Sequence, residues 1–230
     1  YGMPYQHDEI RQIADRYEIP ILEDAAEALG SKYKNLPCGT LGDLSILSFN
    51  GNKIITTSGG GALVAHSKEM KDKAIFLATQ ARDEAVHYQH SEIGYNYRMS
   101  NIVAGIGRGQ MEVLDERVQQ RRANYEFYKK ELSNKEGIIF VEEKKDVFPN
   151  RWLSCILTDS FEKREEIRLN LAADDIESRP LWKPMHLQPV FMNYPNYTNG
   201  VSEDLFNRGL CLPSGSNLSN SDLKRIIEKI

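Results

Sequence analysis

Short apolar segments that end at glycine or proline alternate with segments of helical periodicity, and this alternation is the strongest constraint on the fold. The strand-like segments are "IPILED", "SKYKNLP", "LSILSF" and "GALVAH", each short and apolar or alternating. Residues 8–17, "DEIRQIADRY", and residues 67–80 have helical spacing instead. Strands and helices in alternation predict an α/β domain.

The second half of the chain has a different composition and predicts a smaller unit. A helical pattern runs from residue 100 to 132, and we expect a bend or break near Gly105 to Gly109. After "SNKEG" we predict two strands in 138–158, a helix at 162–176, a proline- and aromatic-rich loop at 177–197 and a closing helix with Ser221 as its cap. The predicted domains are residues 1–134 and 135–230.

Charge and hydropathy exclude several classes of protein. The net charge is −4 and no basic tract with interleaved aromatic residues is present, so nucleic acid is not expected as a partner. No apolar run approaches the roughly 18 residues of a membrane span, and "YGMPYQHDEI" is not a signal peptide, which together predict a cytoplasmic protein. The same opening resembles the interior of a domain, so we expect further residues upstream.

Cysteine and histidine spacing argues against a metal site. Cys38, Cys155 and Cys211 lie far apart without a C-x-x-C pair, which predicts reduced thiols and no zinc ribbon. His87 and His90 could share a helix face, but no carboxylate or cysteine clusters with them. No metal is therefore predicted.

Lys53 stands in the loop "SFNGNKIITTSGGG", between two predicted strands. A phosphate-binding loop of the G-x-x-x-x-G-K-[ST] type is excluded, because Asn52 separates Gly51 from the lysine and the spacing to Gly42 is wrong. A loop lysine is usually a solvated surface residue. The alternative is a lysine whose partial burial favours the neutral amine, which can attack a carbonyl and form a Schiff base.

Two other residues fit a pyridoxal phosphate (PLP) site around this lysine. The cofactor's ring nitrogen must stay protonated, which requires a carboxylate, and Asp24 ends a predicted strand where open α/β sheets bind ligands. Ser48, five residues before Lys53, could donate a hydrogen bond to the cofactor phosphate. Each residue alone could also have a purely structural role, since an aspartate at a strand end commonly forms a turn.

Four motifs in order carry a family resemblance: "LEDAAEALGS", "GDLSILSFNGNKIITTSGGGALV", "GYNYRMSNIVAGIGRGQMEVLDERVQQRR", and "ESRPLWKPMHLQPVF" followed by "GLCLPSG". Over nearly the whole chain they resemble the DegT/DnrJ/EryC1/StrS sugar aminotransferases, which are fold-type-I PLP enzymes. The resemblance implies the remainder of the large, mainly parallel-sheet domain followed by a small C-terminal α+β domain. It also implies that an upstream part of the family fold is missing.

The resemblance also implies roles for single residues. Lys53 would be the lysine that joins PLP covalently, Asp24 the partner of the pyridine nitrogen, and Ser48 a phosphate ligand. Asn96 would reach the phosphate in a neighbouring subunit, so the active site would form in a homodimer. Glu27 stands where many members have glutamine or histidine near the cofactor's O3′ side.

The "NGN", triple-glycine and "SRPLWKPMH" motifs most resemble the enzymes that aminate C4 of UDP-2-acetamido-2,6-dideoxy-hexos-4-ulose. The resemblance suggests L-glutamate as the amino donor. Arg98, Arg179, Lys183 and His186 could meet the donor carboxylate or the UDP diphosphate, and Trp182 could pack on sugar or uracil. A plain surface or packing role for each is equally open.

Three rival interpretations remain beside the aminotransferase. A PLP dehydratase is disfavoured, because such relatives carry histidine where this chain has Lys53. A non-enzymatic regulatory or interaction protein is disfavoured by the presence of Asp24, Ser48, Lys53 and Asn96 together. The third is that these 230 residues are an inactive fragment of the enzyme.

Overall fold

The structure is a computed structural model that describes residues 1–230. The chain forms two compact units. The first, here called the Lys53 unit, comprises residues 2–118 and 145–150. The second, the C-terminal unit, comprises Tyr1 with residues 119–144 and 151–230. The short segment 145–150 therefore belongs with the Lys53 unit, although it follows residues 119–144 of the C-terminal unit in the sequence.

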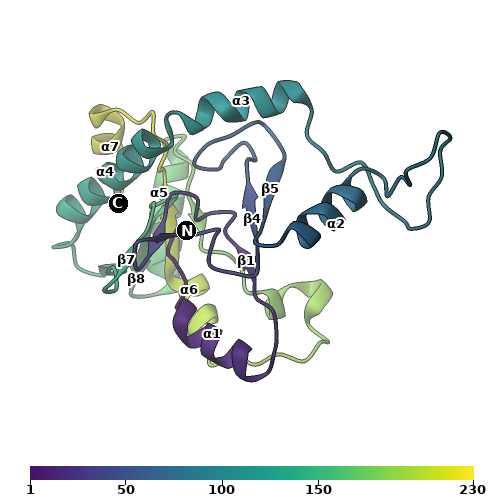
Figure 1. The fold of residues 1–230 in the computed structure, drawn as a ribbon. Helices are drawn as coiled ribbons and strands as arrows, with labels where there is room; N and C mark the ends of the chain where they lie inside the picture. Colours follow the sequence, from purple (N-terminus) through teal and green to yellow (C-terminus); the bar gives the residue numbers. More distant parts are fainter. The chain divides into compact units, whose positions relative to one another are not determined.

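The Lys53 unit is built on a three-stranded sheet with the strand order β1-β4-β5 (Figure 1). β1 and β4 are parallel, and β4 and β5 are antiparallel. β3, β2 and β7 form a second, small antiparallel sheet. The elements of the unit are α1 (His7–Arg16), β1 (Leu22–Asp24), β2 (Lys32–Tyr33), β3 (Leu36–Pro37), β4 (Leu44–Ser48), β5 (Gly61–Ala65), α2 (Lys68–Ala78), α3 (Asn101–Met111), β7 (Val147–Phe148) and the first residues of α4 (Leu114–Leu132). The predicted strand "SKYKNLP" is thus two short strands, β2 and β3.

The register of β1 against β4 is fixed by a buried carboxylate. Glu23 is paired with Ser45, is 4% exposed, and accepts a hydrogen bond from Ser45 Oγ at 3.0 Å. It also accepts from the backbone N–H groups of Gly39 at 2.8 Å and Leu41 at 2.9 Å. Because side chains alternate across a strand, holding Glu23 on one face directs Asp24 to the other.

The predicted break in the long helical pattern lies in a different place from the one expected. α3 continues through Gly105 to Gly109 and ends at Met111, and α4 begins at Leu114. Glycine suits position 107 inside this helix, because a Cβ added there would lie only 3.1 Å from Thr57 Cγ2. The small residue therefore permits a close approach, and the predicted interruption lies after Met111, just beyond the glycines near which it was expected.

The segment between α2 and α3 extends away from the strands as an arm (Figure 1), here defined as residues 79–100. Near its start, Gln80 and Ala81 are both at positive φ. Within it, Asp83 accepts hydrogen bonds from Ser91 Oγ at 2.7 Å and Gln89 Nε2 at 3.0 Å, and these bonds lower the pKa of Asp83. His87 and His90 lie in this irregular segment, so the helix face proposed for them does not form.

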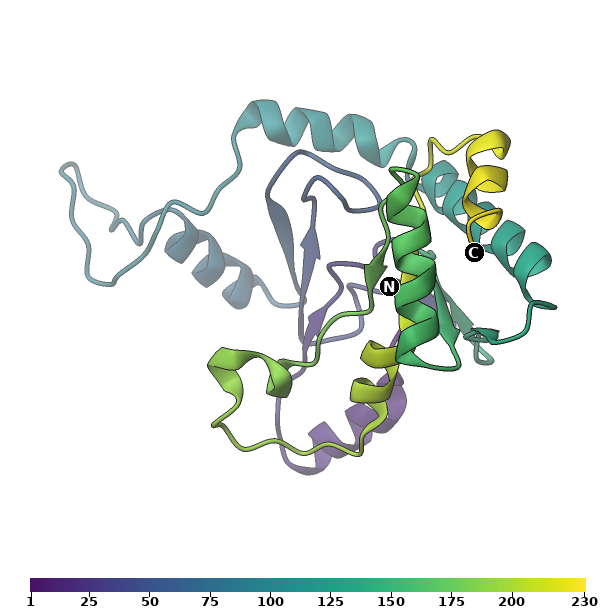
Figure 2. The ribbon, with the colours of Figure 1, turned by 180° about the vertical axis from the view of Figure 1, so that it is seen from behind.

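The C-terminal unit has an antiparallel sheet with the order β6-β8-β10-β9, and α5 packs against β8 and β10 (Figure 2). Its elements are the remainder of α4, β6 (Ile138–Phe140), β8 (Ser154–Thr158), α5 (Phe161–Ala173), β9 (Arg179–Pro180), the 3-10 turns η1 (Met185–Leu187) and η2 (Pro189–Phe191), α6 (Val201–Arg208), β10 (Gly209–Leu212) and α7 (Asn220–Ile227). α6 and β10 were not predicted, and residues 138–158 contain three strands where we expected two.

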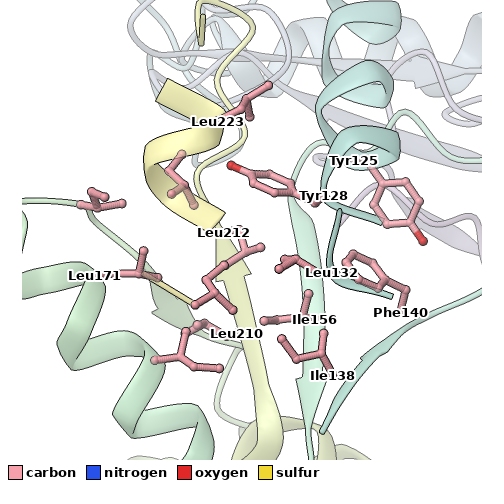
Figure 3. Packing of buried hydrophobic residues seen from close by; sticks show 14 residues of the cluster. Tyr125, Tyr128, Leu132, Ile138, Phe140, Ile156, Leu171, Leu210, Leu212 and Leu223 are labelled. Atoms are coloured by element: carbon pink, nitrogen blue, oxygen red, sulfur yellow. The ribbon is translucent and has the colours of Figure 1, made fainter. Parts of the chain in front are cut away.

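The larger apolar cluster of this unit is formed by α4, α5, α7 and the strands β6, β8 and β10 (Figure 3). Ile156 on β8 and Leu210 on β10 are fully buried at its centre. Tyr125 and Tyr128 point inward from α4, as predicted, and their hydroxyls donate to Val141 O and Pro213 O. Burial raises the pKa of both tyrosines. None of the helices combines the length and apolar composition needed to cross a membrane.

Candidate active site

Lys53 lies in the turn that begins shortly after β4. Its backbone N–H donates to Asn50 O at 3.1 Å, and its side chain is 11% exposed. The next two residues, Ile54 and Ile55, are buried against Val118. This apolar anchor fixes the backbone on one side of the lysine, while the amine remains at the edge of the sheet.

Glu27 is the acidic partner of this lysine. Lys53 Nζ donates to Glu27 Oε1, and the glutamate side chain is 31% exposed. Glu27 belongs to the turn formed by residues 25–30, which follows β1. The turn is tied to the sheet by Ala25 N, which donates to Ile46 O at 3.0 Å. The amine and the carboxylate therefore come from two loops at the same edge of the sheet.

Asp24 and Ser48 end the two parallel strands at this edge. Asp24 is opposite Ile46 in the register, and Ser48 is two residues further along β4. Asp24 Oδ1 accepts from Ala26 N at 3.0 Å, and Ser48 Oγ accepts from Asn50 N at 3.4 Å. Carboxyl ends of adjacent parallel strands are a usual ligand-binding position in α/β sheets.

Asn96 and Arg98 lie on the arm. Both are exposed, and the backbone of Asn96 forms an isolated antiparallel bridge with Thr79. The neighbouring rings of Tyr95 and Tyr97 have centroids 5.4 Å apart. The bridge fixes the base of the arm while leaving these side chains on its surface.

The remaining candidates lie in the C-terminal unit. Arg179 pairs with Glu177 at 2.5 Å, and His186 Nε2 lies 2.6 Å from Glu203 Oε1. Trp182 is 48% exposed, and its ring lies against those of Tyr1 and Trp152, with centroids 5.5 Å and 6.4 Å away. Lys183 is also exposed. The structure thus groups Asp24, Glu27, Ser48 and Lys53, whereas Arg179, Trp182 and His186 belong to the other unit.

The sequence has a family match along its whole length. The model of the DegT/DnrJ/EryC1/StrS aminotransferase family matches residues 1–230. The chain belongs to this family. Aminotransferases of the DegT family act on sugars and use PLP.

Individual relatives agree with this membership. The chain is 51% identical to EpsN of Bacillus subtilis (strain 168) over 99% of its length, and 40% identical to the GDP-perosamine synthase of Escherichia coli O157:H7 over 100%. The crystal structure of the aminotransferase TlmJ from Streptoalloteichus hindustanus is similar, with a TM-score of 0.93 at 26% identity, and 100% of this chain is covered. The chain spans 60% of EpsN, 62% of the perosamine synthase and 62% of TlmJ.

The residues at the sheet edge have the chemistry that the DegT-family cofactor needs. Lys53 supplies an amine for the aldehyde of PLP, and Asp24 supplies a carboxylate for the ring nitrogen. Ser48 supplies a hydroxyl for the phosphate. The parallel pairing of β1 and β4 brings Asp24 and Ser48 to the same edge of the sheet. This donor set fits PLP.

Two buried residues around this site were not found from the sequence of the DegT-family chain. Glu23 organises β1 and β4, and Asn150 bonds to the turn that carries Glu27. A carboxylate beside Asp24 was visible in "LEDAAE", but its burial was not. Asn150 gave no signal, because nothing in "VFPNRW" relates it to a turn more than a hundred residues earlier.

Proposed function

We propose that the protein transfers an amino group from L-glutamate to the C4 keto group of a nucleotide-linked 6-deoxy keto-sugar, using PLP. The observation that carries this proposal is the position of Lys53, little exposed and beside Glu27, at the sheet edge where Asp24 and Ser48 end parallel strands. Family membership supports the sugar aminotransferase class. Because the chain spans about 60% of its relatives, the proposal concerns the whole protein.

The bound cofactor supplies an electron sink and carries the amino group between donor and acceptor. Lys53 would hold it through the ε-amine. Once free of the cofactor, the same amine would move protons at the α-carbon of glutamate and at C4 of the sugar. The carboxylate of Asp24 would keep the ring nitrogen protonated, and the hydroxyl of Ser48 would donate to the phosphate.

Glu27 would act on the lysine through a direct hydrogen bond. Its Oε1 accepts from Lys53 Nζ, which holds the amine in one direction before the cofactor arrives. Glutamine or histidine at this position would offer a neutral or switchable partner instead. We therefore propose that Glu27 contacts the lysine end of the cofactor.

The substrate we propose is UDP-2-acetamido-2,6-dideoxy-hexos-4-ulose. The "NGNK", triple-glycine and "SRPLWKPMH" motifs support it. A relative that is 40% identical to this chain is named GDP-perosamine synthase. A GDP-linked keto-sugar is therefore the main alternative substrate. We assign Arg98, Arg179 and His186 to anionic groups of the substrates and Trp182 to the sugar or base, because guanidinium groups and aromatic faces suit these partners.

We also propose a homodimer in which Asn96 of one subunit reaches the cofactor phosphate of the other. The exposure of Asn96 on the arm supports this arrangement. A cytoplasmic location stays a prediction.

The first test follows the cofactor by absorbance. We expect protein incubated with PLP to turn yellow, and L-glutamate, but not D-glutamate, to shift the band into the near ultraviolet. Lys53→Ala should abolish both the band and turnover, whereas Lys135→Ala, at an exposed turn, should keep them. Steady-state turnover retained by Lys53→Ala would refute the assignment.

The nucleotide is tested with the protein in its glutamate-treated form. UDP-, GDP- and dTDP-linked 4-keto-6-deoxy sugars are compared by kcat/KM and by the mass of the amino product. We expect the UDP-linked 2-acetamido sugar to be preferred. Preference for a GDP-linked sugar would overturn the substrate assignment and leave the aminotransferase assignment intact.

A further inference from the structure

Asn150 is buried beside the turn that carries Glu27. Its side chain has no exposed surface, and Nδ2 donates to two backbone carbonyls, Glu27 O and Leu29 O, each at 2.8 Å. The asparagine follows β7, whose Phe148 pairs with Lys32 on β2. All these residues belong to the Lys53 unit. A remote segment of the chain therefore satisfies the carbonyl groups of the turn.

The backbone of Asn150 adds a second attachment through Ser31. Asn150 N donates to Ser31 Oγ at 2.9 Å, and Ser31 Oγ donates to Gly2 O at 2.7 Å. Ser31 N also donates to Ala28 O at 2.8 Å, inside the turn. Ser31 itself has no exposed surface. The turn is thus held at its middle by the amide of Asn150 and at its end by this serine.

The turn in question sets the position of two site groups. Ala26 N donates to Asp24 Oδ1 at 3.0 Å, so the turn holds one oxygen of the Asp24 carboxylate. One residue later, Glu27 contacts Lys53 Nζ through Oε1. Any shift of the backbone between residues 26 and 29 would move both the carboxylate that faces the lysine and the N–H that orients Asp24.

We propose that Asn150 is a positioning residue of the active site, which holds Glu27 against Lys53 by fixing the turn 25–30. The catalytic significance of this positioning rests on the proposed function. The contacts that carry it are those between Asn150, the two carbonyls and Ser31.

The chemistry of asparagine suits this task. Two N–H donors on one nitrogen can satisfy two carbonyl oxygens on a short side chain. Aspartate has the same shape but, when ionised, only accepts hydrogen bonds, so it would face both carbonyls unfavourably. A buried carbonyl that loses its donor destabilises the local conformation, and the turn would then shift to find a partner.

The chain contains a matched control for a purely structural asparagine. Asn124 is 6% exposed and its Nδ2 donates to Gly215 O at 2.9 Å. It lies in the C-terminal unit, outside the proposed cofactor site. Asn124→Asp therefore removes a bond of the same kind and should affect stability alone.

The test measures Lys53 in cofactor-free protein. An amine-acylating reagent is applied in limited amount, and peptide mass mapping gives the labelling rate of Lys53 relative to exposed lysines. We expect Asn150→Asp to change the relative rate of Lys53 by about tenfold, the factor that corresponds to one or two lost buried hydrogen bonds, and Asn124→Asp to leave it unchanged. Urea unfolding of both variants shows whether they fold equally well.

A double variant separates positioning from general loosening. Glu27→Gln alone should change the rate for Lys53, and adding Asn150→Asp should change it little further, because both act through one contact. Asn150→Ser, which keeps one donor, should lie between the unaltered protein and Asn150→Asp, and it serves if the aspartate variant does not fold. Full additivity of the two changes would overturn the inference.

Cofactor affinity gives an independent readout. We expect Asn150→Asp to weaken PLP binding about tenfold at a fixed pH, with Asn124→Asp unchanged. If Asn150→Asp and Asn124→Asp changed labelling and affinity equally, Asn150 would have only a structural role and the inference would be overturned. An absence of PLP binding in the unaltered protein would refute the proposed function, whereas the labelling experiment would still decide the role of Asn150.

Discussion

At the scale of single residues, neighbouring acids have different tasks because a strand directs them to opposite faces. Glu23 is buried and accepts backbone hydrogen bonds, whereas Asp24 ends the strand at the candidate site. The motif "LEDAAE" predicted the role of Asp24 but not that of Glu23. The alternation of side chains explains the division, but only the position of the loop 38–42 shows which face is buried.

Asp43 is a further carboxylate with a structural task. Its Oδ2 accepts from Ile21 N at 2.7 Å and from both terminal nitrogens of Arg11 at 3.1 Å, which joins α1 to the start of β4. The Ile21 N–H and then Arg11 hold the pKa of Asp43 below its usual value of 3.8. Arg11 also meets Asp15 at 3.4 Å.

A pH titration of stability tests this carboxylate. Because the folded-state pKa lies below the unfolded value, Asp43 contributes stability fully above pH 3.8 and loses the contribution as the pH falls through the folded-state pKa. We expect Asp43→Asn to make the acid-side loss of stability shallower, measured by urea unfolding at stepped pH. The exposed Asp115→Asn serves as the control. An unchanged slope in Asp43→Asn would contradict the assignment.

At the scale of elements, helix ends follow local chemistry, but the choice between neighbouring residues needs the structure. α7 begins after Ser219, whose Oγ accepts from Asp222 N at 3.2 Å, while Asp222 Oδ2 accepts from Ser219 N at 2.9 Å. The prediction of Ser221 as the cap was wrong by two residues. Both serines precede apolar residues at helical spacing, so the sequence pattern did not separate them.

Substitution of each serine separates the two assignments. Ser219→Ala removes the cap and half of the capping box, and we expect it to lower the free energy of unfolding by about 1 kcal/mol. Ser221→Ala, two residues later, should cost less than half as much. Thermal and urea unfolding would measure both, and equal losses would argue against Ser219 as the dominant cap.

At the scale of the whole molecule, the Lys53 unit leaves apolar side chains exposed. Ile13 on α1, Tyr17 just after this helix and Leu22 on β1 are each more than 60% exposed. Within residues 1–230, β1 and β5 form the two edges of their sheet. Since relatives are longer than this chain, we expect further polypeptide or a second subunit to cover such surface.

The proposed dimer can be tested by mixing inactive subunits. Lys53→Ala and Asn96→Ala subunits, refolded together in equal amounts, should recover about a quarter of the unaltered activity, because half of the dimers are hybrids with one intact site. Lys53→Ala mixed with the Lys53→Ala/Asn96→Ala double variant should recover none. Sedimentation confirms that dimers form. Dimers without recovery would show that Asn96 does not act across subunits.

The sequence by itself determined features that are encoded within short windows. The helices α1 and α2, the strands that end at Asp24 and Ser48, the inward tyrosines of α4 and the family motifs were all predicted, because periodicity and motif spacing are local properties. The position of Lys53 in a turn at a strand end followed in the same way.

Only the tertiary structure decided how distant segments complete the candidate site. Asn150 meets a turn 121 to 123 residues earlier in the chain, and Glu23 closes a loop 16 to 18 residues away. Neither contact has a period or a characteristic spacing. Each forms because a folded backbone leaves buried carbonyl or N–H groups that require partners, and any residue of suitable chemistry that packs there can supply one.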